Sequence, residues 1–316
     1  MNSQGPKLVV GFIIYGRVTA KYLPYFLDSL KKQTFSDFQI LVCDNTPKDV
    51  DNPNLEYLKK DWLVTSGENR GFSGAYNILI QEALKRGAEY FLALNPDIIL
   101  EPEAILNLVK KMKENKTLGS ASPKVLKWDF ENNKKMSIID TCGIRQRSGL
   151  IFYDLGQGET DNGQYDDQEI LGPSGAAAIF RSSALKKIKE SERYFDEMMF
   201  MYKEDCDLAY RLYLSGLKSV CVGGAIVYHD RTASGKGGGN LGIALNRKNK
   251  SRQVKAWSFL NQQIIFYKYW RLQGFFDKLN IVWYQIKTFI FITLFEQYLF
   301  KEWLKFLKIR KNIKKY

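Results

Sequence analysis

The chain has 316 residues, a net charge of +13 and a hydrophobic content of 45%, which is ample for a sizeable core and excludes disorder as the default. Residues 247–316 hold 16 Lys and Arg against three acids, which leaves 31 of each sign in residues 1–246. The four cysteines have no CxxC spacing, which predicts neither a zinc knuckle nor a disulfide framework and fits a reducing cytoplasm.

The first part of the chain alternates between predicted strands and helices. Residues 7–15 and 38–45 are near-continuous apolar runs, typical of strands covered on both faces, and residues 22–33 between them have helical spacing. The alternation continues as strand, helix, strand and helix at residues 62–66, 73–86, 88–94 and 102–115. This pattern predicts an α/β fold with a mostly parallel sheet flanked by helices. The first apolar run lacks a basic leading segment and is short, so it indicates a buried strand rather than a signal peptide.

A looser, polar sequence with short strand candidates follows at residues 120–171. Further core elements, a strand, a helix and a strand, are expected at residues 176–180, 203–214 and 218–228. The glycine-rich residues 232–240 predict either a loop that closes over a bound ligand or a plain flexible linker. We place a domain boundary here, with an α/β domain at 1–240 and a basic, aromatic-rich helical region at 241–316.

Candidate metal ligands follow two of the predicted strands. Asn95-Pro96-Asp97 directly follows the predicted strand at 88–94, at the edge where open α/β sheets bind ligands. Its two side-chain oxygens could bind a divalent cation, which would neutralise the charge of a diphosphate. An Asx-Pro turn opening the next helix explains the same tripeptide. His229, the only histidine, follows the last predicted strand and is a candidate nitrogen ligand for the same cation, although a lone histidine is often structural or exposed.

An acidic run, Glu204-Asp205-Cys206-Asp207, begins the predicted helix at 203–214. A carboxylate held beside apolar residues suits a general base that acts on an acceptor hydroxyl, and a second would support the metal or the acceptor. Complementation of the helix dipole is the alternative explanation.

The segment Asn69-Arg70-Gly71 joins a predicted strand to a predicted helix and is similar to a phosphate-cradling turn. It matches neither the dinucleotide fingerprint nor the P-loop, and Gly235-Lys236-Gly237 has no following Ser or Thr. These mismatches argue against a dehydrogenase and against an NTPase.

Several ordered segments carry a family resemblance over about residues 7–230. They are VCDN at 42–45, ENRGFSGAYN at 68–77, YFLALNPD at 90–97, GPSGAAAIFRSSAL at 172–185, FDEMMFMYKEDCDLAYRL at 195–212 and AIVYHD at 225–230. Together they resemble the family-two glycosyltransferases of GT-A fold, particularly the bacterial rhamnosyltransferase-like branch. The resemblance implies an inverting hexosyltransferase that uses a nucleotide-sugar donor and Mg²⁺ or Mn²⁺.

The resemblance also implies residue roles. Those on the donor side would be the base or ribose contact Asp44 and the nucleotide and diphosphate neighbours Asn69, Arg70 and Gly71. Asn95 and Asp97 occupy the family's DxD position, where Asp97 would be the stronger metal ligand and His229 a third. Asp205 matches the catalytic base and Glu204 would assist it. The acceptor would be bound by Asp207, Ser174 and Gly175.

Residues 257–307 interleave aromatic side chains with lysines and arginines, and no uncharged stretch reaches the ~18 residues of a membrane-spanning helix. Amphipathic helices lying on an anionic membrane surface account for this composition. Helices packed on the catalytic domain or on a partner are the alternative. We expect a cytoplasmic protein held peripherally on the inner face of the cell membrane.

The expected acceptor is a glycan or polyprenyl-linked saccharide in cell-wall polysaccharide synthesis, and L-rhamnose from dTDP-rhamnose is the best guess for the donor. The sequence is compatible with an oligomer. Two other functions remain open, a non-catalytic nucleotide-sugar-binding scaffold and a nucleic-acid-binding protein that grips phosphates with its basic tail. No nucleic acid is expected as a partner, because that function leaves the catalytic segments unexplained.

Overall fold

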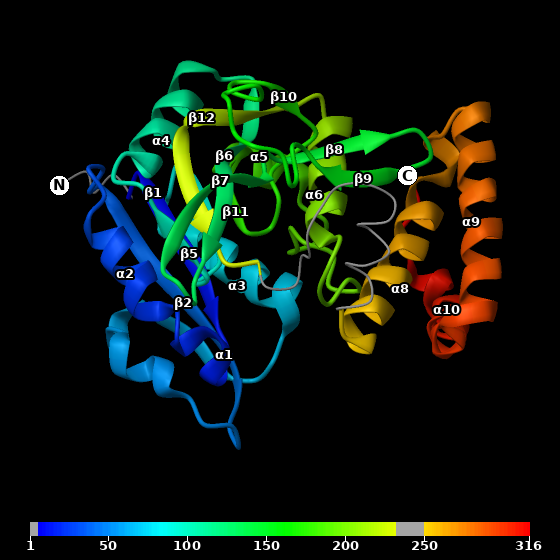
Figure 1. The fold of residues 1–316 in the computed structure, drawn as a ribbon, viewed down its shortest axis with the longest axis horizontal. Helices are drawn as coiled ribbons and strands as arrows, with labels where there is room; N and C mark the ends of the chain where they lie inside the picture. The colour runs from blue at the N-terminus through cyan, green and yellow to red at the C-terminus, as the bar shows by residue number, and fades with distance from the viewer. Residues whose placement is uncertain (1–5, 232–249) are drawn as a thin grey trace.

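A single mixed β-sheet lies at the centre of the computed structural model, which describes residues 6–231 and 250–316. Its strands are β1 (Leu8–Ile14), β2 (Phe38–Pro47), β3 (Leu63–Gly67), β4 (Tyr90–Leu94), β5 (Ile98–Leu100), β6 (Leu118–Asp129), β7 (Lys134–Thr141), β10 (Glu169–Ile170), β11 (Ala177–Arg181) and β12 (Lys218–His229). They follow the order β10-β12-β6-β11-β4-β1-β2-β3, with β5 beside β12 and β7 beside β6 (Figure 1). A separate hairpin consists of β8 (Ile144–Arg147) and β9 (Ile151–Asp154).

Helices cover both faces of the sheet. They are α1 (Gly16–Ala20), α2 (Leu23–Lys31), α3 (Gly71–Lys85), α4 (Ala104–Glu114), α5 (Ser182–Ile188) and α6 (Glu204–Leu214). In β1, Leu8 and Val10 share a buried cluster with α2 and α4, whereas Val9 shares another with α3, α5 and α6. Burial on both faces explains why this strand reads as a continuous apolar run.

The strand directions bring several loops to one edge of the sheet. β3, β2, β1 and β4 are parallel, β12 is parallel to β6, and β11 lies antiparallel between β4 and β6. β12 therefore runs in the same direction as β4, and both strands end at the same edge. The expected α/β fold is confirmed, and the strands and helices predicted before residue 116 begin and end within two residues of the observed ones.

The C-terminal region consists of α8 (Arg252–Tyr269), α9 (Phe275–Phe295) and α10 (Phe300–Ile309), joined by short 3-10 turns. Leu260, Ile264 and Tyr269 of α8 share a buried cluster with Cys206 and Tyr210 of α6. α8 thus lies between α6 and α9 and packs on the α/β domain (Figure 1). Among the described helices, none combines the length and the hydropathy that crossing a membrane requires.

Candidate active site

The loops after β4 and β12 meet at the carboxyl edge of the sheet. β5, which follows Asp97 directly, pairs antiparallel with β12 and places His229 opposite Ile98. The backbone N–H of Asp230 donates to the Asp97 carbonyl at 3.0 Å. As a result, Asp97 Oδ1 lies 3.4 Å from His229 Nε2, although the two residues are far apart in the sequence.

A buried carboxylate fixes the orientation of His229. Nδ1 of His229 is 2.9 Å from Oδ2 of Asp140, and both side chains are almost fully buried. Burial alone would lower the pKa of His229, but the charge of Asp97 and the hydrogen bond with Asp140 raise it to about 10. Burial alone would raise the pKa of Asp140, but the His229 hydrogen bond and the charge of Arg231 lower it. Asp140 therefore stays ionised behind the imidazole and leaves Nε2 facing Asp97.

This arrangement fits a divalent cation. Asp97 Oδ1 is buried and its contact with His229 Nε2, at 3.4 Å, is too long for a good hydrogen bond, so a divalent cation would take the place of the imidazole proton between the two side chains. An imidazole that is held through its other nitrogen by a carboxylate is a common metal-ligand arrangement. In residues 6–231 and 250–316 no group of three or more His, Cys, Asp and Glu forms a ready metal site. Asp97 and His229 would thus hold the ion with oxygens from a diphosphate or water.

Three residues that the sequence analysis did not predict, Asp140, Asp154 and Arg231, form a charged cluster beside His229. Nη1 of Arg231 lies 3.4 Å from Asp140 Oδ1 and 2.9 Å from Asp154 Oδ2. Asp140 is the next-to-last residue of β7 and Asp154 is the last of β9, so both come from the loosely patterned residues 120–171. The sequence held a signal for Asp140, which directly follows Ile138 and Ile139. A charged residue in a buried strand is rarely found unless it is paired.

A left-handed turn presents the acidic run. Tyr202 and Lys203 have φ angles of 71° and 68°, which are uncommon for residues other than glycine, and α6 begins directly after them. Asp205 Oδ2 accepts a hydrogen bond from the Gly175 N–H at 2.9 Å. A Cβ on Gly175 would lie 3.0 Å from the Phe72 ring, so this position favours glycine. The predicted pair of Asp205 and Gly175 is therefore in direct contact.

The two neighbouring acids of this run differ in how strongly their pKa values are raised. Burial raises the pKa of Asp205, although the Gly175 N–H opposes the rise. Burial and the charge of Asp205 raise the pKa of Glu204 well above its ordinary value, and Glu204 Oε2 has no hydrogen-bond partner among the described residues. Glu204 therefore holds a proton more tightly than Asp205, and Asp205 is the member of the pair that ionises more readily. Burial also raises the pKa of Tyr202, although the charge of Arg231 opposes the rise.

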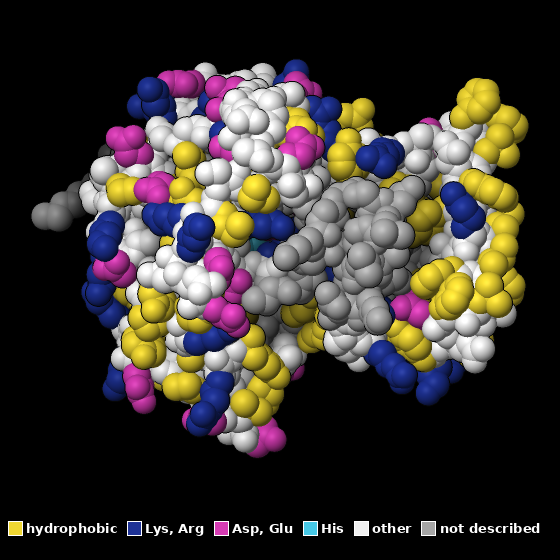
Figure 2. All heavy atoms as spheres, in the orientation of Figure 1, with side chains coloured by type: hydrophobic (Ala, Val, Ile, Leu, Met, Phe, Trp, Pro, Cys, Tyr) yellow, Lys and Arg dark blue, Asp and Glu magenta, His cyan; other side chains and the backbone are white. Residues whose placement is uncertain are grey.

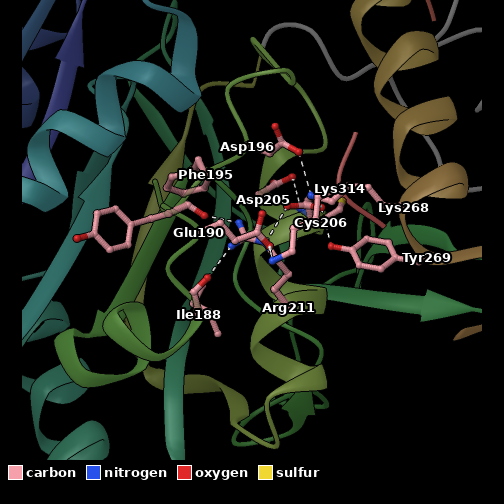
Figure 3. Close-up of polar contacts among 12 residues, drawn as sticks. Ile188, Glu190, Phe195, Asp196, Asp205, Cys206, Arg211, Lys268, Tyr269 and Lys314 are labelled. Atoms are coloured by element: carbon pink, nitrogen blue, oxygen red, sulfur yellow. Dashed lines mark hydrogen bonds and ion pairs between the residues drawn. The ribbon is translucent and has the colours of Figure 1, made fainter. Parts of the chain in front are cut away.

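Asp207 has a different environment from the one predicted for it. Its side chain is fully buried, with Oδ2 3.0 Å from Arg211 Nε and Oδ1 2.7 Å from both Lys268 Nζ and Tyr269 OH. Burial would raise its pKa, but Lys268 and Arg211 lower it to about 2. Figure 3 shows Arg211, Lys268 and Tyr269 converging beside α6. Asp207 has no exposed surface to offer an acceptor, and its contacts join α6 to α8.

The donor-side residues lie around the start of α3. Gly71 has a φ of +65°, and a Cβ there would lie 2.4 Å from the Phe200 carbonyl oxygen, so only glycine fits. Asn69 Oδ1 accepts from the Gly71 N–H at 3.0 Å, and Arg70 pairs with Glu68 at 2.6 Å. Asn45, which the sequence did not single out, donates to the Gly71 carbonyl at 2.9 Å.

The remaining predicted residues are at or near the ends of their strands. Asp44, in the second half of strand β2, is buried and accepts from Thr46 N at 2.9 Å and Asn52 Nδ2 at 2.8 Å. Asn95 is held through its backbone N–H, which donates to the Ala176 carbonyl at 2.9 Å, and Ser174 is buried near Asp205. The loop at 232–240 lies outside the described residues.

The fold is shared with known glycosyltransferases. GalNAc-T7, solved with UDP, GalNAc and Mn²⁺, superimposes with a TM-score of 0.60 at 15% identity, over 84% of this chain and 49% of that one. TarS from S. aureus gives a TM-score of 0.50 at 17% identity, over 83% of this chain and 39% of that one. Residues 1–349 of TarS give 0.52 at 18% identity, over 95% and 79%. This chain thus spans half or less of the first two, and the likeness establishes the GT-A fold.

The sequence itself gives the family. No curated protein matches the chain. The profile described as glycosyl transferase family 2 matches residues 10–189, a stretch that includes Asp44, the segment at 69–71, Asp97 and Gly175 but ends before Asp205 and His229. Because this match covers more than half of the sequence, the chain belongs to glycosyl transferase family 2.

Proposed function

We propose that this protein is an inverting, metal-dependent glycosyltransferase that moves a sugar from a nucleotide-sugar to a hydroxyl of a glycan or lipid-linked saccharide. The observation that carries the proposal is the meeting of Asp97 and His229 at one sheet edge, with Asp205 held by Gly175, whose neighbour Ala176 accepts from the Asn95 N–H. The family match and the UDP and Mn²⁺ in the GalNAc-T7 structure support it. L-rhamnose from dTDP-rhamnose is the donor to test first, with a role in cell-surface polysaccharide synthesis.

In the proposed reaction, Asp205 takes the proton from the acceptor hydroxyl. The acceptor oxygen bonds to the anomeric carbon as the bond to the diphosphate oxygen breaks, so the configuration inverts and no covalent enzyme intermediate forms. The raised pKa of Asp205 makes its ionised form a stronger proton acceptor than an ordinary aspartate. Mg²⁺ or Mn²⁺, when bound at Asp97 and His229, would supply positive charge to the departing nucleoside diphosphate.

The proposed binding residues divide by side. Asp44, Asn69, Arg70, Gly71 and Asn95 serve the donor, and Ser174 and Gly175 lie beside Asp205 on the acceptor side. We leave Asp207 out of the acceptor site because it is sealed between Arg211 and Lys268. We also propose that the protein works on the inner face of the cell membrane, where a lipid-linked acceptor is found.

The test is a screen of nucleotide-sugars, dTDP-rhamnose first, for thermal stabilisation with Mg²⁺, with Mn²⁺ and with EDTA. Calorimetry with the matching nucleoside diphosphate then compares wild-type protein with Asp97→Ala. We expect metal-dependent binding in wild type and loss of that dependence in the variant. Diphosphate affinity unchanged by EDTA and by Asp97→Ala would refute the metal assignment.

Transfer assays with the donor that binds separate the alternatives. Binding without transfer or hydrolysis would favour a non-catalytic scaffold. Steeply salt-dependent binding to RNA or DNA, with no donor bound, would favour the nucleic-acid alternative.

A further inference from the structure

An apolar groove lies on the side of α8 that faces away from the α/β domain. It measures about 470 Å³ and runs between α8, α9 and α10, with Phe266 and Trp270, Val282, Ile286 and Phe289, and Phe306 among its walls. Its volume is within the range of small-molecule sites in proteins. Gln263 and Gln285 are the polar residues of its lining.

These two glutamines leave polar groups unpaired in the groove. Gln285 Nε2 donates to Gln263 Oε1, while Gln263 Nε2 and Gln285 Oε1 have no partner among the described residues. Exchanging O and N in both amides gives the same result, one free donor and one free acceptor. Gln263 is 2% exposed, so its unpaired group lowers the stability of the fold at this point. The groove therefore offers a hydrocarbon surface with one polar point.

The helix that forms its outer wall is exposed along its apolar side. In α9 only Ile281 and Ile292 are buried, whereas Phe276 is 76%, Phe295 71% and Leu294 65% exposed. Figure 2 shows hydrophobic side chains along the outer edge of the molecule at α9, with Lys and Arg side chains close to them. An apolar helix surface of this kind is typical of a site that meets a membrane or a partner.

The charges around the groove favour an anionic surface over a second copy of this chain. Residues 270–316 hold ten Lys and Arg against three acids. Of those acids, Asp277 accepts from Gly149 N at 3.0 Å and Glu296 lies 3.1 Å from Lys255 Nζ, so both are turned into the fold. Two copies of this face would bring like charges together, whereas an anionic leaflet attracts each lysine near it.

Two lysines stand beside aromatic rings of the groove lining. Lys278 Nζ is 5.9 Å from the Trp270 ring centre, and Lys315 Nζ is 4.4 Å from that of Tyr267. Both rings belong to the groove wall, so the cations lie at its margin. A ligand with an apolar chain and a phosphate would place the first in the groove and the second at these lysines.

We propose that the groove holds one hydrocarbon chain of an anionic membrane lipid, with the lipid phosphate near Lys278 and Lys315. The inference rests on the proposed attachment to a membrane surface and adds a single-lipid site to it. α8 forms one wall of this site and on its other side contacts the turn before Glu204, so the lipid would be held by the same helix that supports the acidic run.

The test uses the full chain with phosphatidylglycerol whose acyl chain carries a photoactivatable diazirine, in vesicles, with the matching phosphatidylcholine as comparison. Val282→Trp fills the groove, and Leu279→Trp makes a similar change on α9 at a residue of similar exposure outside the lining. We expect cross-links at residues 263–270 and 282–290, stronger with phosphatidylglycerol, and severalfold weaker in Val282→Trp but not in Leu279→Trp.

Co-sedimentation with the same vesicles and sedimentation velocity without lipid separate the outcomes. If the protein pellets with the vesicles but the groove peptides carry no cross-link, or if the two variants are labelled equally, the groove site is wrong and membrane attachment still holds. Absence of pelleting would overturn both. If the protein forms a dimer without lipid and Val282→Trp dissociates it, the groove binds a second copy of the chain and the lipid site is wrong. None of these measurements depends on sugar transfer, and Lys278→Gln should reduce the preference for phosphatidylglycerol even if Val282→Trp folds poorly.

Discussion

Helices α8 and α9 come from one basic, aromatic stretch of sequence, yet they differ in which kind of side chain they bury and which kind they expose. α8 buries polar side chains, with Asn261, Gln263 and Lys268 each at most 2% exposed. α9 exposes apolar ones, and Phe275 and Phe276 are more than 70% exposed. Burial of polar groups requires partners, and exposure of apolar groups suggests contact with something outside the chain. The composition of residues 247–316 as a whole therefore describes neither helix.

Asn261 and Lys268 of α8 have their partners in the acidic run and in the segment just before it. Asn261 Nδ2 donates to the carbonyls of Met201 at 2.9 Å and Tyr202 at 2.6 Å, in the left-handed turn before Glu204. Lys268 pairs with Asp196 at 2.9 Å as well as with Asp207. By its packing, α8 continues the α/β domain beyond residue 240, and changes in it should reach the chemistry. Substitutions in α9 should leave the catalytic rate unchanged.

The largest effect is expected at the acidic run that α8 supports. Asp205→Asn removes the proposed base without changing its size, so transfer should fall by about 10²–10⁴-fold while donor binding is retained. Steady-state kinetics and calorimetry measure the two. Glu204→Gln is the matched control and should cost less, because Glu204 ionises less readily than Asp205. Turnover near the wild-type rate in Asp205→Asn would move the base role to another residue.

A large loss of stability is expected when the buried charge pair between α8 and α6 is broken. Lys268→Met keeps the length of the side chain but leaves the Asp207 carboxylate without its nearest cation, which should lower the free energy of unfolding by about 3–5 kcal/mol. Denaturant unfolding at pH 7 measures it. Lys278→Met on α9 is the control and should have little effect.

The same pair has a pH dependence with a definite sign. The pKa of Asp207 is lowered to about 2 in the folded protein, so its stabilisation is fully present above the unfolded value of about 4 and is lost as the pH falls toward 2. Wild type should therefore lose stability between pH 4 and pH 2 more steeply than Lys268→Met does. Parallel acid curves for the two proteins would contradict this role of Asp207.

A smaller effect is expected at Asn261. Asn261→Leu leaves the Met201 and Tyr202 carbonyls without their donor, which should cost about 1–3 kcal/mol of stability. Because that turn places Asp205, kcat should fall more than KM for the donor rises. Asn280→Leu on α9 removes an exposed hydrogen bond to Ser148 and should leave both quantities nearly unchanged. An unchanged kcat in a folded Asn261→Leu protein would separate α8 from the chemistry.

The sequence predicts some parts of the fold and of the candidate site better than others. The α/β core was predictable because strands covered on both faces are continuous apolar runs. Asp97 and His229 were predictable as neighbours because each follows a strand that ends at the same sheet edge. Their metal role and the roles of the other candidate residues stay predictions.

The rest depended on pairings between distant segments. Asp140, Asp154 and Arg231 join three elements that no local pattern connects. Asp207 sits two residues after Asp205, and only the packing of α8 shows that one is sealed in the fold and the other faces Gly175. In α8, the polar run Asn261-Gln262-Gln263 between apolar residues was a local sign of a helix buried on both sides, but its partners come from the turn at 201–202 and from Leu150.

The smallest effect on stability is expected on α9, and it is the sharpest test of the division. Phe276→Ser and Phe295→Ser remove side chains that are 76% and 71% exposed, so unfolding should change by no more than about 0.5 kcal/mol for each, as for ordinary surface substitutions. Activity toward a soluble acceptor should also be unchanged. Pelleting with phosphatidylglycerol vesicles should nevertheless weaken, and the binding that remains should be more sensitive to salt, because the apolar part of the attachment is lost while the lysines remain. A loss of about 2 kcal/mol or more in the lipid-free protein would mean that α9 is already covered, as in a dimer, and the contrast with α8 would then be one between two buried helices.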